Sequence, residues 1–246
     1  MNTAFNSGRS PSENSAGTCC AVLLRGGRSR RMGRDKALLP WKESTFLETI
    51  ASELDFLDEK YLSVAAAGGS PDRGIPASAA EGGEKDRSSD RGILTSAAEG
   101  GEKGSSPDRD SLSADWIRLP DLIPDCGPLG GIYTALQTCR AEWALVVSCD
   151  VPAVQQSFFK MLLQERSGGV DIIYPLTPDG RMHMTCAAYR KAVAPILRQQ
   201  IEKGDNRLRV LPDLCRAKAV RIEEPDLIRM ISNINTGEEF DRILYN

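Results

Sequence analysis

The feature that most constrains the fold is a short apolar run that ends in a glycine- and arginine-rich loop, between positions 21 and 40. Leu23 and Leu24 complete a run of strand length, and the Gly26–Gly27 pair allows the backbone N–H groups to come close to a ligand. The loop carries five cations within nine positions, namely Arg28, Arg30, Arg31, Arg34 and Lys36. This density suits a polyphosphate better than an ordinary turn. We therefore predict a first strand followed by an anion-binding loop, which matches neither G-x-x-x-x-G-K-[ST] nor G-x-G-x-x-G.

Composition narrows the class of protein. With 246 residues, 41% of them apolar, one α/β domain with an extra segment is the simplest division. The net charge of −3 argues against general nucleic-acid binding, and seven cysteines without a C-x-x-C pair indicate neither a zinc site nor a disulfide scaffold. Residues 1–17 are polar, and no later run is long enough to cross a bilayer. We expect a cytoplasmic protein with a flexible N-terminal tail and no membrane or nucleic-acid partner.

After the loop, the chain alternates between helix and strand patterns. Ser44 can cap a helix whose apolar stripe consists of Phe46, Leu47, Ile50, Leu54 and Leu57. A strand over 61–66 then gives the order typical of a parallel α/β sheet, in which ligands bind at the carboxyl ends of the strands. Further strands are expected over 115–119, 170–175 and 183–189, with a helix over 155–166.

A repeated segment interrupts this pattern. Residues 72–85 return eighteen positions later as 90–103 with two changes, and a third copy begins at Asp108. The unit is rich in Gly, Ser and charged residues, so it cannot bury enough surface to offset the entropy of ordering it. We predict a disordered insertion over residues 68–112, although a role of the repeats in binding a partner stays open. Such an insertion costs little, because loop-closure entropy grows only with the logarithm of length.

The strongest signal after the first loop is an apolar run, residues 143–149, that delivers Asp150 to its carboxyl end and is stopped by Pro152. A carboxylate in that place is a hard oxygen ligand for Mg²⁺, which fills its other positions with water and substrate phosphate. A plain turn residue at the end of a strand is the alternative. Upstream, Pro128 suits the first turn of a helix that follows Gly127.

The only histidine, His183, excludes a histidine metal cluster. It could pack and donate a hydrogen bond, or it could contact a substrate. Near the C-terminus, Thr236 with Glu239 three positions later forms a capping-box pattern.

Six segments together resemble one known family. The run Leu24-Arg25-Gly26-Gly27-x-Ser29-x-Arg31-Met32-Gly33-x-Asp35-Lys36 resembles the signature loop of the MobA-like nucleotidyltransferases, most closely the molybdenum-cofactor guanylyltransferases, with Arg25 in place of an alanine. Residues 127–131 resemble their Gly-Pro-Leu-x-Gly motif, and 143–150 their strand with a magnesium aspartate. His183 begins a segment that usually starts His-Pro, and Gly204 to Leu208 resembles Gly-x-x-Arg-Leu. Residues 233–240 resemble Asn-x-Asn-Thr-Pro-Glu-Glu-Leu, with Gly237 in place of the proline.

The resemblance implies a single-domain, mostly parallel, Rossmann-like three-layer fold over residues 18–246, interrupted by the low-complexity insertion. It implies that GMP moves from Mg-GTP to the terminal phosphate of molybdopterin, carrying molybdenum, with release of pyrophosphate. Catalytic roles fall to Lys36, Asp150 and Arg31, with Mg²⁺ on Asp150. The implied nucleotide-binding residues are Leu24, Arg25, Gly26, Gly27, Lys36, Asp121, Gly127, Pro128, Leu129 and Asp150. The implied acceptor-binding residues are His183, Arg207, Asn233, Asn235 and Thr236. Asp121 stands, with a difference of one residue in spacing, where the family places an aspartate that recognises guanine.

Two other functions remain open at this point. A relative within the superfamily could transfer CMP or UMP to molybdopterin or to a small phosphate. A non-catalytic nucleotide-binding accessory protein could keep the fold, since Arg25, Met184 and Gly237 depart from the family pattern. Partners beyond GTP and molybdopterin would be molybdenum-insertion proteins or target molybdoenzymes in transient contact.

Overall fold

A computed structural model describes residues 17–25, 35–65, 112–234, 236 and 239. Most of the predicted N-terminal tail, residues 26–34 of the first loop, and residues 68–111 of the predicted insertion lie outside the described residues. The expectations for these segments therefore stay predictions.

The described residues form a seven-stranded sheet in the order β5-β4-β1-β6-β8-β7-β9. The strands are β1 (Cys19–Leu24), β4 (Lys60–Val64), β5 (Trp116–Pro120), β6 (Trp143–Ser148), β7 (Ile172–Leu176), β8 (Cys186–Arg190) and β9 (Ala217–Arg221). Within this sheet only β8 runs antiparallel to its neighbours. Six strands therefore direct their carboxyl ends toward the same edge, together with the start of β8. A two-stranded hairpin, β2 (Pro40–Trp41) with β3 (Ser44–Thr45), stands apart from the sheet.

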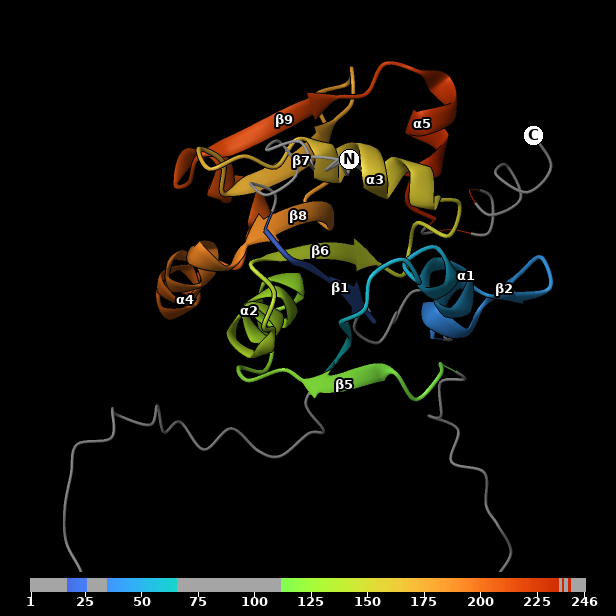
Figure 1. Ribbon diagram of the computed structural model, residues 1–246, viewed down its shortest axis with the longest axis horizontal. Helices are drawn as coiled ribbons and strands as arrows, with labels where there is room; N and C mark the ends of the chain where they lie inside the picture. Colours follow the sequence, from blue (N-terminus) through green and yellow to red (C-terminus); the bar gives the residue numbers. More distant parts are fainter. Residues whose placement is uncertain (1–16, 26–34, 66–111, 235, 237–238, 240–246) are drawn as a thin grey trace, which may run out of the picture. The chain divides into compact units, whose positions relative to one another are not determined.

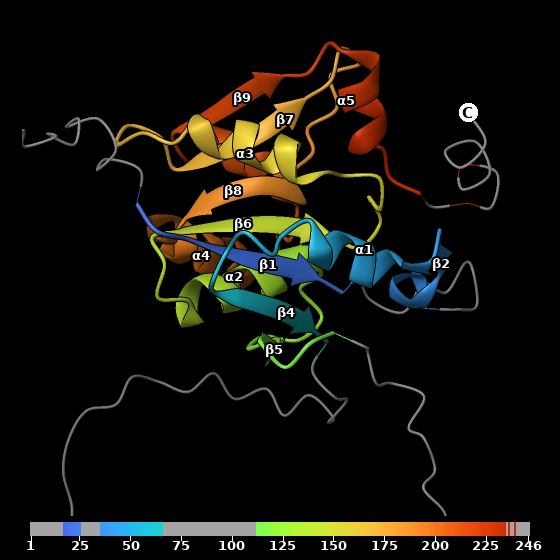
Figure 2. The same ribbon diagram turned by 45° about the vertical axis from the view of Figure 1, so that its right-hand side comes forward.

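Helices cover both faces of the sheet (Figure 1). They are α1 (Phe46–Ser52), α2 (Pro128–Thr138), α3 (Gln156–Gln164), α4 (Ala194–Glu202) and α5 (Pro225–Met230), with 3₁₀ turns η1 (Lys36–Leu38), η2 (Lys191–Val193) and η3 (Leu208–Asp213). Figure 2 shows α1 and α3 on one side of the sheet and α2 and α4 on the other. Each side carries its own apolar core, so the architecture is the expected helix–sheet–helix sandwich.

Strand β1 shows why the sheet lies at the centre. Ala21 and Leu23 belong to the core on the α1 and α3 side, whereas Val22 and Leu24 belong to the core on the α2 and α4 side. Burial of both faces explains the continuous apolar run, since burying one such side chain contributes about 1.5–3 kcal/mol. The predicted mostly parallel, three-layer fold is confirmed.

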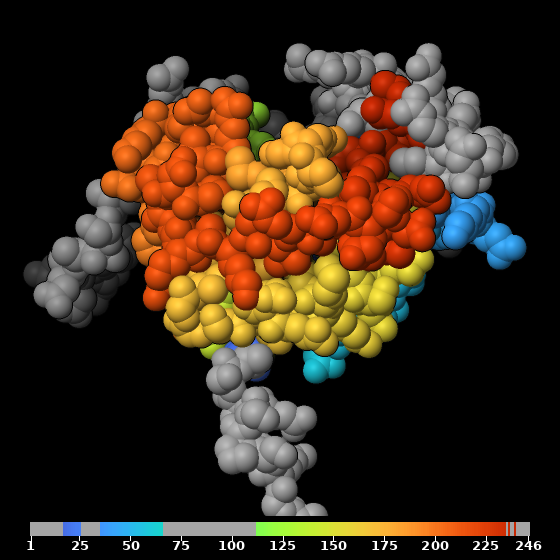
Figure 3. Space-filling model, turned by 90° about the horizontal axis from the view of Figure 1, so that it is seen from above, coloured from blue at the N-terminus to red at the C-terminus, as the bar shows by residue number. Residues whose placement is uncertain are grey.

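The sheet ends at β9, which forms much of the surface in Figure 3 together with α5. Charged pairs hold this edge, with Lys218 bound to Glu165 and Arg216 to Asp171. Charges of this kind protect an edge strand against pairing with another chain. No helix within the described ranges is long and apolar enough to span a membrane.

Three local predictions were wrong in detail. Helix α1 ends at Ser52, so Leu54 and Leu57 of the predicted stripe lie beyond it, although both are buried in the same core. The N-cap of α1 is Thr45 rather than Ser44, because Thr45 and Glu48 form a complete capping box while Ser44 pairs with Trp41 in the hairpin. The last predicted strand begins at Cys186 rather than at His183, and its residues do not alternate in burial. Both faces of β8 are buried, because Cys186 and Ala188 belong to the core on the α1 and α3 side, whereas Ala187 and Tyr189 belong to the core on the α2 and α4 side.

Candidate functional site

Strands β1 and β6 end at the same level of the sheet. Leu24 is paired with Ser148, and the backbone N–H of Cys149 donates to the Leu24 carbonyl over 3.1 Å. The pairing therefore continues one residue past β6, and Asp150 leaves the sheet beside the beginning of the glycine- and arginine-rich loop. The register of two buried strands thus positions the predicted metal carboxylate.

The carboxylate of Asp150 has two unequal oxygens. Oδ2 accepts a hydrogen bond of 2.8 Å from the side-chain amide of Asn233, 83 positions along the chain. Oδ1 is buried and, within the described part of the protein, has no hydrogen-bond partner. A buried carboxylate oxygen without a partner is unfavourable unless a ligand satisfies it. Its chemistry fits a hard divalent cation.

Lys36, which follows the glycine- and arginine-rich loop in the chain, lies close to Asp150 because both contact Ile234. It opens η1, where the side chain of Asp35 accepts from the N–H of Ala37 as an N-cap. The Nζ of Lys36 donates to the carbonyl of Ile234 over 3.1 Å, and the N–H of Ile234 donates to the carbonyl of Asp150 over 2.8 Å. The backbone of Ile234 therefore joins two of the three predicted catalytic residues, Lys36 and Asp150.

Arg25 and Asp35 close the base of the loop. The Nε and Nη2 atoms of Arg25 donate to Oδ2 of Asp35 over 3.0 and 2.8 Å. The side chains of this pair are only partly exposed, and the two residues flank positions 26–34 in the chain. Positions 26–34, among them the predicted site residues Gly26, Gly27 and Arg31, lie outside the described residues. Arg25, which departs from the family pattern, is thus engaged in an ion pair with a residue of the same motif.

A second group of predicted residues gathers at the ends of β4 and β5. The hydroxyl of Ser63 donates to Oδ1 of Asp121 over 3.0 Å. Burial raises the pKa of Asp121, while the bond from Ser63 opposes that rise. Helix α2 starts beside this pair: a Cβ added to Gly131 would collide with Ser63 and lie 3.0 Å from Cδ2 of Leu24. The glycine therefore lets the helix pack directly on β4.

The start of α2 follows the sequence prediction. Pro128 occupies the first turn, and Gly127 has a φ of 57°, which favours glycine. Leu129 and Leu24 are both buried in the core under α2. Because these two leucine side chains are buried, only their backbones could contact a nucleotide. Gly127 and Pro128 are exposed and are accessible to a ligand.

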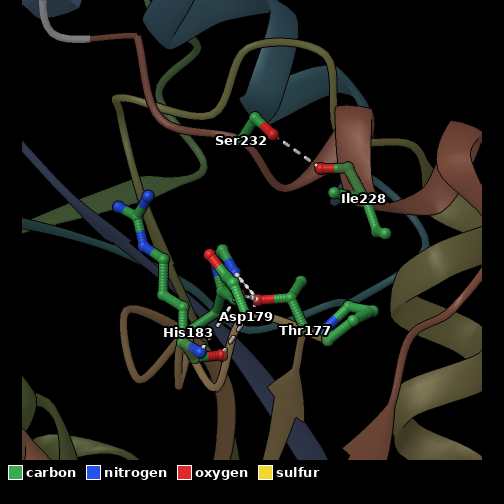
Figure 4. A pocket seen from close by; sticks show the side chains of 7 residues that line it. Thr177, Asp179, His183, Ile228 and Ser232 are labelled. Carbon is green, nitrogen blue, oxygen red and sulfur yellow. Dashed lines mark hydrogen bonds between the residues drawn. The ribbon is translucent and has the colours of Figure 1, made fainter.

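His183 lines a pocket of about 340 Å³ beyond the end of β7. Its Nε2 lies 3.4 Å from Oγ1 of Thr177, which donates to Oδ1 of Asp179 over 2.5 Å (Figure 4). Burial, with a smaller effect of Arg181, lowers the pKa of His183 to about 4, so the ring is neutral at pH 7. Ser232, which follows the end of α5, also lines the pocket and stands one position before Asn233, the donor to Asp150. The pocket and the carboxylate of Asp150 are thus linked through consecutive residues of the chain.

The remaining predicted acceptor residues are placed differently. Arg207 lies on the exposed turn between α4 and η3, where its Nε and Nη2 donate to the two oxygens of Asp205, both over 2.7 Å. The hydrogen bonds of the described residues do not join Arg207 to Asp150. Thr236 is exposed and forms the predicted capping-box bonds with Glu239, and Asn235 lies outside the described residues.

Sequence reasoning missed two participants in this arrangement. Ile234 contributes through its backbone, so its side chain carries no chemical signal. Ser63 contributes a hydroxyl to Asp121, and its only signal is its position near the end of a predicted strand. The contact between Asn233 and Asp150 was also missed, because the motif placed Asn233 with the acceptor.

Comparison with known proteins gives a consistent result. A family model described as the MobA-like NTP transferase domain matches residues 21–218. A probable molybdenum cofactor guanylyltransferase of Flavobacterium johnsoniae is 30% identical over 129 residues, covering 52% of this chain and 67% of the relative. A protein of the same description from Bacillus mycoides is 23% identical over 229 residues, covering 90% and 94%.

Solved structures share the fold at lower identity. Molybdopterin-guanine dinucleotide biosynthesis protein A of Archaeoglobus fulgidus superposes with a TM-score of 0.63 at 17% identity, covering 91% of this chain and 96% of that one. Rv0371c of Mycobacterium tuberculosis, in complex with manganese, superposes with a TM-score of 0.55 at 15% identity, covering 92% and 98%. These likenesses concern the fold alone.

Proposed function

Because the chain belongs to the MobA-like NTP transferase family, we propose that it transfers GMP from GTP to the terminal phosphate of molybdopterin, as a molybdenum cofactor guanylyltransferase. The product is the guanine dinucleotide form of the cofactor, and pyrophosphate is released. The observation that carries this proposal is the junction at Ile234, which holds the cation of Lys36 and the carboxylate segment of Asp150 at one place. A triphosphate with its metal requires that combination of charges.

The donor set fits a magnesium ion. The described residues contain no group of three or more His, Cys, Asp or Glu side chains arranged for a metal. We assign the ion to the single carboxylate of Asp150. Its buried Oδ1 is available for this purpose. One carboxylate completed by phosphate oxygens and water is the usual environment of protein-bound Mg²⁺. When bound, the ion would neutralise charge on the phosphates and on the leaving pyrophosphate.

The protein's own residues act by position and charge. An oxygen of the acceptor phosphate attacks the α-phosphorus of GTP, and the bond from that phosphorus to the pyrophosphate oxygen breaks. Lys36 and the backbone N–H groups of the first loop bind the triphosphate and hold it in line with the acceptor. Transfer of this kind needs no covalent intermediate on the protein. Burial lowers the pKa of His183, which favours a neutral ring that acts as a hydrogen-bonding group rather than as a cation.

Asp121 is the group that we assign to the base. A carboxylate accepts hydrogen bonds from the two donors on the Watson–Crick edge of guanine, N1–H and the exocyclic amine. Cytosine presents a single donor beside two acceptors on that edge, so the same carboxylate favours GTP over CTP. Ser63 fixes Oδ1 of Asp121 through its hydroxyl, and partial burial strengthens the remaining hydrogen bonds. We further assign the activity to the cytoplasm.

Pyrophosphate release tests the proposal. The purified protein would be given Mg²⁺ and molybdopterin with GTP, CTP, UTP or ATP in turn, with Asp150→Ala as the control. We expect release with GTP that is absent in the control. A preference for CTP would instead indicate that the protein transfers CMP to molybdopterin. No release from a folded protein that binds GTP would favour a non-catalytic accessory role.

A further inference from the structure

The residues between α5 and the capping box cross the candidate site. We call residues 232–234 the C-terminal strap. The strap contacts Asp150 twice, through the amide of Asn233 and the backbone N–H of Ile234, and it contacts Lys36 once through the carbonyl of Ile234. Two segments that are more than 110 positions apart in the chain are therefore tied together by a third.

The strap is anchored by the side chain of Ile234. This side chain is fully buried in a small apolar cluster with Trp41 and Phe46, whose rings meet edge to face at 5.5 Å. Leu39 and Ala153 pack against the same cluster. Leu39 follows Lys36 by three positions and Ala153 follows Asp150 by three, so the anchor holds the strap to the two segments that carry the catalytic residues. The position of Asn233 is thereby fixed.

The amide of Asn233 orients the carboxylate. It donates to Oδ2 of Asp150 over 2.8 Å, and this bond leaves Oδ1, which is buried and has no hydrogen-bond partner among the described residues, available to a ligand. Partners of this kind fix the orientation and basicity of a carboxylate that binds a metal, and losing one typically reduces metal affinity 10- to 100-fold. This bond uses one of the two N–H donors of the Asn233 amide and ties that amide to the metal side of the site.

We infer that Asn233 is a positioning residue for the metal-binding carboxylate of Asp150, and not a contact to the acceptor as its motif suggests. The inference rests on the proposed function, because it takes Asp150 as the metal ligand. It assigns the first asparagine of the Asn-x-Asn motif to the metal and nucleotide half of the reaction.

Metal binding measured without turnover tests the inference. Mn²⁺ would be titrated into the wild-type protein, Asn233→Ala and Asn233→Leu in the presence of GTP, with free Mn²⁺ followed by electron paramagnetic resonance. Asn233→Leu keeps the side-chain size and removes the donor, so it replaces the alanine variant if that one does not fold. Gln199→Ala, which removes an exposed amide on α4, is the matched control. We expect the Kd for Mn²⁺ to rise about tenfold in the Asn233 variants and to stay unchanged in the control.

Steady-state kinetics separate the two roles of Asn233. We expect turnover of the variants to recover as Mg²⁺ is raised, with the KM for molybdopterin within about twofold of the wild type. An unchanged Kd for Mn²⁺ together with a large rise in the KM for molybdopterin would overturn the inference. If the wild-type protein itself neither binds Mn²⁺ nor releases pyrophosphate, the proposed function fails instead, and the two failures are distinguishable.

Discussion

At the scale of single residues, the site depends on atoms left unsatisfied by the fold. Asp150 keeps a buried oxygen without a hydrogen-bond partner among the described residues, and a structural turn residue would gain nothing from this arrangement. Residues that are placed for function commonly lower the stability of the folded protein. A substitution of Asp150 should therefore change activity without impairing folding.

We predict that Asp150→Asn lowers turnover with GTP at least a hundredfold without lowering the thermal melting temperature. The amide has the same shape but binds Mg²⁺ poorly, and its oxygen can still accept the hydrogen bond from Asn233, so we expect no loss of native-state stability. Activity and differential scanning calorimetry on the same preparation check this. A fall in melting temperature parallel to the loss of activity would point to a structural role for Asp150.

His183 carries a pH dependence of stability. Its pKa is about 4 in the folded protein, mainly because of burial, and about 6.5 in an unfolded chain. Between these values the unfolded state binds more protons, so stability falls as the pH falls from 6.5 toward 4, by up to about 3 kcal/mol. Urea unfolding at pH 7 and pH 4.5 should show a smaller loss for His183→Gln than for the wild type. Equal losses would mean that other groups govern this range.

At the scale of elements, the close approach of α2 to β4 sets the position of Asp121. Ser63 lies between the helix and the carboxylate, and Gly131 leaves room for it. Movement of the first turn of α2 would therefore displace Ser63 and, through it, the carboxylate of Asp121, to which we assign the base.

We expect Gly131→Ala to destabilise the protein by about 1–3 kcal/mol and to raise the KM for GTP, since the new methyl group must displace Ser63 or Leu24. Chemical denaturation and steady-state kinetics measure the two effects. Gly168→Ala, where an added Cβ meets nothing within 4 Å, is the matched control and should change stability by less than about 0.5 kcal/mol. Equal stability and equal KM for GTP in the two variants would show that the close packing of α2 on β4 affects neither quantity.

The elements themselves were largely predictable. Apolar runs of strand length identified β1 and β6, and Pro128 marked the start of α2 within one residue. The reversed direction of β8 and its place between β6 and β7 could not be predicted, because strand order depends on long-range pairing that leaves no local pattern. For the same reason the strap was invisible: the contacts of Ile234 with Asp150 and Lys36 are backbone contacts across the chain.

At the scale of the whole molecule, the sheet brings Lys36, Asp150 and Asp121 to one edge from three distant segments. The family match runs across the repeat segment, and the chain re-enters the sheet at β5 directly after it. The repeat segment therefore lies in the chain between β4 and β5.

We predict that residues 68–112 are dispensable. A chain in which Gly68 is joined to Leu112 by a short flexible linker should fold, with a melting temperature and GTP turnover close to those of the full chain, because a surface insertion changes stability mainly through loop closure. Circular dichroism and the pyrophosphate assay would measure both. Loss of folding in the shortened chain would show that the repeats belong to the core.

The central claim, that the protein moves GMP onto a pterin phosphate, is tested most directly by following the α-phosphorus. GTP labelled at the α-phosphate would be incubated with the protein, Mg²⁺ and molybdopterin, and the products would be separated and identified by mass. We predict that the label enters a product with the mass of the guanine dinucleotide, and that label placed at the γ-phosphate leaves only in pyrophosphate. Two results would contradict this claim. One is γ-phosphate label in the pterin product, and the other is the absence of any α-labelled pterin product from folded protein that binds GTP.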